Sequence, residues 1–182
     1  MRTLLASALC LVVVSAASAE PVDNPAFKSW SKFKPGTQIS MKTESEFNKM
    51  KSEIVIVTKL VEVGADKCVV EVETITKING MEFKAPAMKQ DVPKTFDVPK
   101  PKDGKDPKVE TPDVKKEEGK ETLKIGGVEV KTTWMKYKSK TPTGEHEGQT
   151  WLSEDVPGGL VKSVSKAGDV STKTELIEIK KP

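Results

Sequence analysis

The sequence is poor in the residues that most often carry chemistry at neutral pH. Its 182 residues include one histidine and two cysteines, and Arg2 is the only arginine. Enzymes usually need a base or a nucleophile whose pKa is tuned by its neighbours, and few candidates are present here. With no arginine after Arg2, the rest of the chain has no guanidinium group, which binds phosphate or carboxylate through two parallel hydrogen bonds. We therefore expect a non-enzymatic protein without a cofactor.

The chain also lacks a strong net charge and a pair of cysteines for a disulfide. The 30 Lys and Arg residues nearly balance the 27 Asp and Glu residues, so no strong field would draw the protein to nucleic acid or to an anionic membrane. Cys10 lies in an N-terminal apolar run, and its removal with that run leaves Cys68 unpaired. We expect no nucleic-acid partner, and stability that comes from packing.

No apolar run is long enough to cross a bilayer, which takes about 20 residues. The longest, Leu4–Val14, follows the positive Arg2 and precedes the small residues 15–19. This is the order of a secretory signal peptide rather than of a membrane anchor. No transmembrane segment is predicted.

The small residues Ala17 and Ala19 fit the A-x-A pattern of a signal-peptidase site. We expect cleavage after Ala19, with residues 1–19 as the signal peptide. Residues 20–182 then form one β domain of ordinary single-domain size. The mature protein is expected to be exported, either periplasmic or secreted.

A short amphipathic helix is predicted near the start of the mature chain. Asn24 is a good capping residue and Pro25 suits the first helical position. Aromatic residues then recur every third position: Phe27, Trp30 and Phe33. Pro35-Gly36 should close this helix.

From Thr37 the apolar pattern changes to the alternation of β-strands, interrupted by turn signals. The runs Glu53–Val63 and Cys68–Thr76 predict one hairpin, and Asn79-Gly80 predicts a second directly after it. Gly126-Gly127 predicts a third hairpin. A turn at 156–159 and another at 167–169 complete a consecutive antiparallel order.

Residues 91–120 interrupt this pattern with prolines among lysines and acids, and offer little that could be buried. We predict a Lys/Pro-rich flexible loop within the domain. The fold class expected is mainly β with a minor α part. It is a curved antiparallel sheet or open half-barrel of roughly eight strands, with one N-terminal helix packed on it.

The run from Trp151 to Ser163, in which a strand is followed by an acidic turn, a proline and an outgoing strand, resembles the LolA-like half-barrel exported proteins. With the aromatic helix and the long meander before it, this resemblance implies a half-barrel that binds acyl chains or lipidated proteins. The start at 33–37, the Lys-Pro loop and the Val-Pro-Gly-Gly turn also look like an uncharacterised group of exported planctomycete-type proteins. That second resemblance implies no activity.

Reactive constellations are few. A Cys68–His146 pair would suit a hydrolase, which would need His146 within hydrogen-bond reach of Cys68 or of a serine in a cleft. Glu145-His146-Glu147 could supply metal ligands, but adjacent strand residues point to opposite faces. Cys68 is better explained as a buried structural thiol, and Glu145-His146-Glu147 as part of a solvated charged loop. We therefore predict no catalytic residue and no metal site.

The remaining feature is a set of large apolar side chains on the predicted helix and strands. Either they line a cavity for an apolar ligand or they form the core between helix and sheet. The candidate ligand-binding residues are Phe27, Trp30, Phe33, Met41, Phe83, Trp134 and Trp151. Two hypotheses follow: a protein that binds an apolar ligand, lipid or lipidated partner, or a structural or protein-interaction module of the cell envelope that uses a sheet edge or the Lys-Pro loop.

Overall fold

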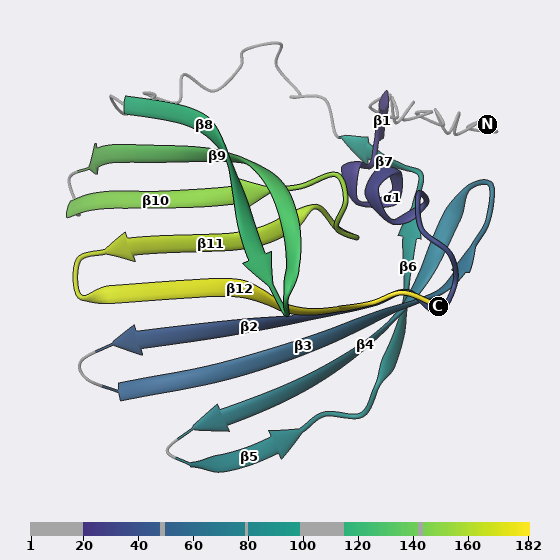
Figure 1. Cartoon of the computed structure of the whole chain (residues 1–182), viewed down its shortest axis with the longest axis horizontal. Helices are drawn as coiled ribbons and strands as arrows, with labels where there is room; N and C mark the ends of the chain where they lie inside the picture. The colour runs from purple at the N-terminus through teal and green to yellow at the C-terminus, as the bar shows by residue number, and fades with distance from the viewer. Residues whose placement is uncertain (1–19, 48–49, 79, 99–114, 142–143) are drawn as a thin grey trace, which may run out of the picture.

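The computed structural model describes residues 20–47, 50–78, 80–98, 115–141 and 144–182 (Figure 1). Within these ranges the chain forms one short helix and twelve strands. In chain order they are β1 Glu20–Asp23, α1 Pro25–Trp30, β2 Gln38–Phe47, β3 Met50–Val63, β4 Lys67–Ile78, β5 Met81–Lys84, β6 Met88–Pro93, β7 Thr95–Val98, β8 Lys115–Ile125, β9 Val128–Thr141, β10 Gly144–Leu152, β11 Leu160–Ala167 and β12 Val170–Lys180.

The predicted helix forms with the predicted cap but ends earlier than expected. The Asn24 side chain accepts a hydrogen bond of 3.0 Å from the Ala26 N–H, and proline opens the first turn. After Trp30 the Phe33 N–H bonds to the Trp30 carbonyl at 3.1 Å, a tighter i to i+3 pattern. The α-helix therefore ends at Trp30, and the chain reaches the predicted end at Pro35-Gly36 through this tighter turn.

The strands form one open antiparallel sheet of ten strands and a small two-stranded sheet, β1 with β7. The order in the large sheet is β5-β4-β3-β2-β12-β11-β10-β9-β8, and β6 pairs with the remaining length of β4. Two meanders, β2–β5 and β8–β12, therefore meet where β12 pairs with β2 (Figure 1). The mainly β fold, the curved open antiparallel sheet and the single short helix are confirmed.

The structure differs from the prediction in the number of strands and at both ends of the predicted loop 91–120. Strand β6 extends from Met88 to Pro93 and pairs with β4, and β7 pairs with β1. The other end of the loop belongs to β8, which pairs along β9. Backbone pairing needs no apolar side chains, so a polar, proline-containing segment can still add edge strands. Residues 99–114 lie outside the described part of the chain.

The hairpin turns follow the glycine pattern of the sequence. Gly126 and Gly127 have φ of +54° and +88°, as a two-residue turn with positive φ at both positions requires. Gly80 has φ of +82°, while Asn79, the other half of that predicted turn, lies outside the described residues. The predicted signal peptide at 1–19 lies outside them too.

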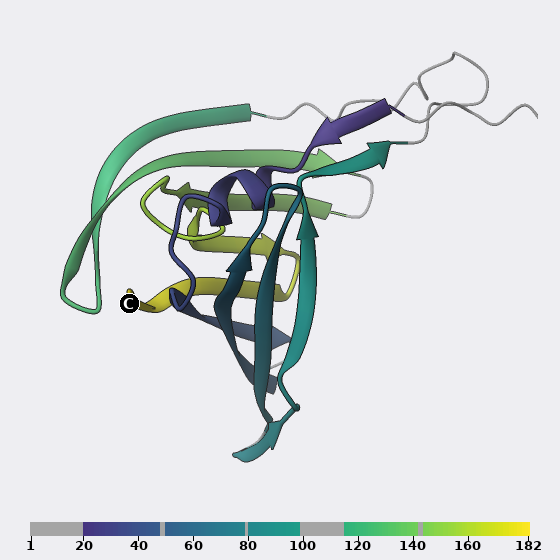
Figure 2. The same cartoon turned by 90° about the vertical axis from the view of Figure 1, so that its right-hand side faces the viewer.

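The buried core forms where α1 and the turn after β10 meet one face of the sheet. Figure 1 places α1 above the tip of β6, and Figure 2 shows it between the β8–β9 hairpin and β6. Leu60, Val156, Val161 and Leu176 are almost completely buried there, together with Trp30. The far ends of β2, β3, β4 and β5 extend away from this cluster (Figure 1).

Candidate functional site

An apolar pocket lies between α1 and the sheet. Its volume is about 360 Å³, and eight of its twelve lining residues come from β2, β3, β4 and β6, four sheet strands that lie side by side. The others come from α1 and from the segment 157–160. The lining residues are Trp30, Ile39, Met41, Ile56, Thr58, Val70, Val72, Gln90, Val92, Pro157, Gly158 and Leu160.

Strand register explains why these side chains converge. Met41 lies opposite Ile56 in the β2–β3 pair, and Thr58 lies opposite Val72 in the β3–β4 pair. Residues directly opposite in antiparallel strands share a face, and alternate residues along a strand do too. One face of these strands therefore carries the pocket, while Val55 and Val57 point to the other face.

Beyond the pocket the same face carries threonine and serine rows, including Ser45 opposite Ser52, and becomes apolar again at the free ends of the hairpins. Ile54 continues the row of Ile56 on β3, and Phe47 lies opposite Met50 where β2 and β3 end. Met50, Met81 and Phe83 are 62%, 60% and 56% exposed. Large apolar side chains gathered on one exposed face usually indicate a contact surface for another molecule.

The structure brings together only part of the predicted ligand-binding set. Trp30 and Met41 line the pocket. Phe27 and Phe33 pack against the core beside them without lining it. Phe83 lies on the edge strand β5, opposite Thr76, at the exposed end of the same face.

The two tryptophans Trp134 and Trp151 lie opposite each other on β9 and β10. The indole N–H of Trp151 donates to the Glu121 carboxylate, and the Lys162 ammonium lies 4.8 Å from the centre of its ring. Neither tryptophan is among the residues that line the apolar pocket. Their contacts are those of side chains that hold β8, β9, β10 and β11 together.

Sequence reasoning missed most of the pocket lining because it searched for aromatic residues. Ile39, Ile56, Val70, Val72 and Val92 form the walls. Their alternation along each strand was visible in the sequence, but pairing partners as distant as Val70 and Gln90 were not.

A second, polar hollow lies on the other side of α1, between the helix and strands β8 and β9. Its volume is about 1020 Å³. Lys28 and Lys32 contribute from the helical segment, and Lys120 and Lys131 from the two strands. Gly158 lines both this hollow and the apolar pocket, so the two adjoin beneath α1.

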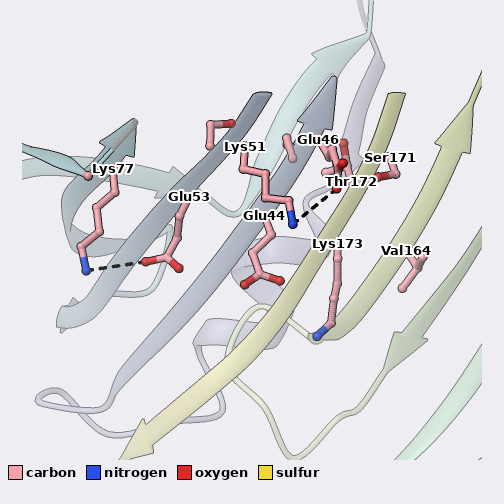
Figure 3. A pocket seen from close by; sticks show the side chains of 12 residues that line it. Glu44, Glu46, Lys51, Glu53, Lys77, Val164, Ser171, Thr172 and Lys173 are labelled. Atoms are coloured by element: carbon pink, nitrogen blue, oxygen red, sulfur yellow. Dashed lines mark hydrogen bonds and ion pairs between the residues drawn. The ribbon is translucent and has the colours of Figure 1, made fainter. Parts of the chain in front are cut away.

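A third hollow, of about 790 Å³, lies over the far ends of β2, β3 and β12 and has a charged lining (Figure 3). Its lysines and glutamates pair across strands: Lys77 lies 3.6 Å from Glu53, and Lys51 lies 3.9 Å from Glu46. Alternating opposite charges of this kind form a solvated outer face of a sheet. This hollow offers no apolar enclosure for a ligand.

Four charged side chains form a network across the joint between the two meanders. Glu175 lies 2.7 Å from Lys173 and 3.6 Å from Lys42, and Lys42 lies 2.9 Å from Glu44. The hydrogen bond and the charge of Lys173, followed by the charge of Lys42, lower the pKa of Glu175. Because Lys42 and Glu175 are directly opposite on β2 and β12, the network links the N-terminal and C-terminal halves of the sheet.

We predict that Glu175→Gln lowers the free energy of unfolding by about 0.5–1 kcal/mol at pH 7 and by much less at pH 3. A carboxylate whose pKa is lowered on folding stabilises the fold above its unfolded pKa of about 4.3, and loses this effect as pH falls through the folded value. Urea unfolding at the two pH values measures the difference. Glu118→Gln, at an exposed position on β8 opposite Met135 and with no ion-pair partner among the described residues, is the control. Equal losses at both pH values would contradict the prediction.

The candidate reactive residues lie far apart. Cys68 is on β4 and His146 on β10, and β3, β2, β12 and β11 separate these strands in the sheet. Burial raises the pKa of the Cys68 thiol, which disfavours the nucleophilic thiolate. Among residues whose positions are described, no group of three or more His, Cys, Asp or Glu is arranged to hold a metal ion.

In the described ranges, no helix has the length and apolar character needed to span a membrane. No protein-family model and no curated protein matches the sequence.

Three solved structures have a similar chain path. A protein from Bacteroides fragilis described as exported, with a YmcC-like fold, is 12% identical, with a TM-score of 0.46 over 82% of this chain and 97% of its own. A protein from Parabacteroides distasonis described as a lipoprotein is 13% identical, with a TM-score of 0.46 over 81% and 96%. The Mycobacterium tuberculosis lipoprotein LppX is 8% identical, with a TM-score of 0.36 over 87% and 94%. These partial similarities carry nothing about ligand or activity.

Proposed function

We propose that this chain is an exported, non-enzymatic binding protein that holds an apolar ligand, a lipid or a lipidated partner, in the pocket between α1 and strands β2, β3, β4 and β6. The observation that carries the proposal is the pocket itself, whose walls are almost entirely aliphatic and aromatic. Its volume of about 360 Å³ lies within the range of small-molecule sites, which begins near 300 Å³.

The chemistry of the walls favours an alkyl chain over a polar ligand. Thr58 and Gln90 are the only lining residues with polar side chains. Each methylene group that leaves water and is fully buried against such walls contributes up to about 0.8 kcal/mol. A chain of several methylene groups would therefore bind with useful affinity without any specific polar contact.

The apolar side chains at the hairpin ends lie on the same face as the pocket. A long chain that leaves the pocket along Ile54 would cross Ser45 and Ser52 before it reaches Phe47 and Met50. The signal sequence predicted at 1–19 would place such a carrier outside the cytoplasm, where lipids need a protein to cross water.

The test is to fill the pocket and measure binding of a fluorescent apolar probe such as N-phenylnaphthylamine. Ile56→Trp puts an indole into the pocket, and we expect it to weaken probe binding at least tenfold. Val57→Trp adds the same ring to the next residue on the opposite face of β3, and is the matched control. It should leave probe affinity unchanged.

Lipid extraction from protein purified from its own host complements this experiment, since a bound lipid in stoichiometric amount would identify the ligand. Failure of the unmodified protein to bind the probe, or equal binding by both variants, would overturn the proposal.

A second candidate function is a protein-interaction module of the cell envelope. The observation that favours it is the short edge strand β5, where Met81 and Phe83 are both exposed beside an unpaired backbone edge. In this case Phe83→Lys would abolish capture of a partner protein while leaving probe binding in the pocket intact.

A further inference from the structure

We propose that the ligand is an amphiphile with an anionic head group. Its chain occupies the apolar pocket, and its head group lies in the polar hollow among Lys28, Lys120 and Lys131. This inference rests on the proposed function, and adds to it the chemical class of the ligand and the residues that select it.

The two hollows are placed to hold the two parts of one molecule. Trp30 on α1 lines the apolar pocket, whereas Lys28 and Ser29 on the same helix line the polar hollow. Gly158 lines both. It has φ of +78°, and a Cβ added to it would lie 3.5 Å from the Trp30 indole nitrogen. Gly158 and the Trp30 indole therefore form the boundary at which the two hollows adjoin.

The polar hollow carries an excess of positive charge. Lys32 is paired with Glu154 at 3.1 Å, and Glu121 accepts the hydrogen bond from Trp151. Apart from the Lys32–Glu154 ion pair, Glu121 and Asp155 are the carboxylates that line the hollow, against three lysines, because a hydrogen bond from the neutral Trp151 indole leaves the charge of Glu121 in place. In the part of the chain that the structure describes, no carboxylate lies within ion-pair distance of these three lysines.

Strand register places two of these lysines on one side of the β8–β9 pair. Lys120 lies opposite Thr133, and Lys131 lies opposite Thr122. These two cross-strand pairs are neighbours on the same face, so two ammonium groups and two hydroxyl groups point into one space. An anionic head group would lower the mutual repulsion of the lysines and accept hydrogen bonds from the hydroxyls.

The experiment compares two competitors with the same chain, hexadecanoate and its methyl ester, at pH 8 and low salt, for displacement of the apolar probe. We expect the unmodified protein to prefer the anion by about tenfold or more, which corresponds to about 1.4 kcal/mol. Replacing Lys28, Lys120 and Lys131 together by Gln should remove this preference and leave the affinity for the ester unchanged. The control replaces Lys77, Lys84 and Lys138 by Gln, which removes the same charge at positions that do not line the polar hollow.

Each other outcome has a definite meaning. If neither competitor displaces the probe and the probe itself does not bind, the proposed function fails. If both competitors bind alike, or if the control triple loses the preference as well, the head-group site is wrong while the carrier function stands. Displacement by acetate alone would indicate a simple anion site and would also overturn the amphiphile.

Discussion

Replacing Leu60 by alanine is expected to lower the free energy of unfolding by about 2–5 kcal/mol. The Leu60 side chain is 0% exposed and lies opposite Val70 at the end of β3, within the core cluster. Removing it loses the transfer free energy of the deleted methyl and methylene groups and leaves a cavity that the surrounding sheet cannot close. For a domain of this size, the loss is a large part of the total stability.

The effect should come from the side chain alone. The Leu60 N–H donates to the Thr37 carbonyl at 2.8 Å, and its carbonyl accepts from the Gly36 N–H at 2.7 Å. Alanine preserves both bonds, which attach the segment before β2 to the end of β3. Backbone pairing would therefore remain, and the measured loss would report packing between the sheet and the chain that covers it.

Leu152→Ala is the matched control, since it removes the same atoms from a side chain that is 48% exposed. Urea unfolding monitored by tryptophan fluorescence should place its loss at about 1 kcal/mol or less, well below that of Leu60→Ala. Equal losses for the two variants would mean that Leu60 is not part of the core.

Local signals in the sequence predicted the local structure well. The cap at Asn24 was visible because a side-chain acceptor followed by proline acts within one helical turn. The hairpin at Gly126-Gly127 was visible because positive φ at both positions is a requirement of the turn itself. In both cases the residues that carry the information are adjacent in the chain.

Long-range pairing was harder to predict, and the pocket depends on it. Cys68 pairs with Val92 and Ile39 pairs with Thr58 to build the pocket wall, and no local pattern specifies either partner. Trp134 and Trp151 were predicted to bind ligand because they are large and apolar, yet strand register places them in cross-strand contacts outside the pocket. The type of side chain alone does not distinguish a residue that lines the pocket from one that packs elsewhere on the sheet.

The second large effect is expected at Gly148, where alanine should destabilise the fold by about 1–3 kcal/mol. In an ordinary strand, Gly→Ala stabilises by about 0.4–1 kcal/mol, because it restricts the unfolded chain. Here Gly148 lies directly opposite Tyr137, and a Cβ would approach the phenol ring within 2.7 Å. The ring covers the glycine backbone and must move to accommodate a methyl group. Trp134 covers Gly119 on the neighbouring pair in the same way.

A double-mutant cycle separates this clash from other effects of the substitution. With Tyr137→Ala as the background, the space above Gly148 is empty, so Gly148→Ala should become neutral or stabilising by up to about 1 kcal/mol. Urea unfolding of the four proteins gives the coupling energy between the two positions. A Gly148→Ala penalty that persists without the tyrosine ring would contradict the clash. The effect of Gly148→Ala on stability should change sign because the Tyr137 ring occupies the space that a side chain at position 148 would fill. The preference for glycine at position 148 therefore depends on Tyr137 and is not a property of the strand alone.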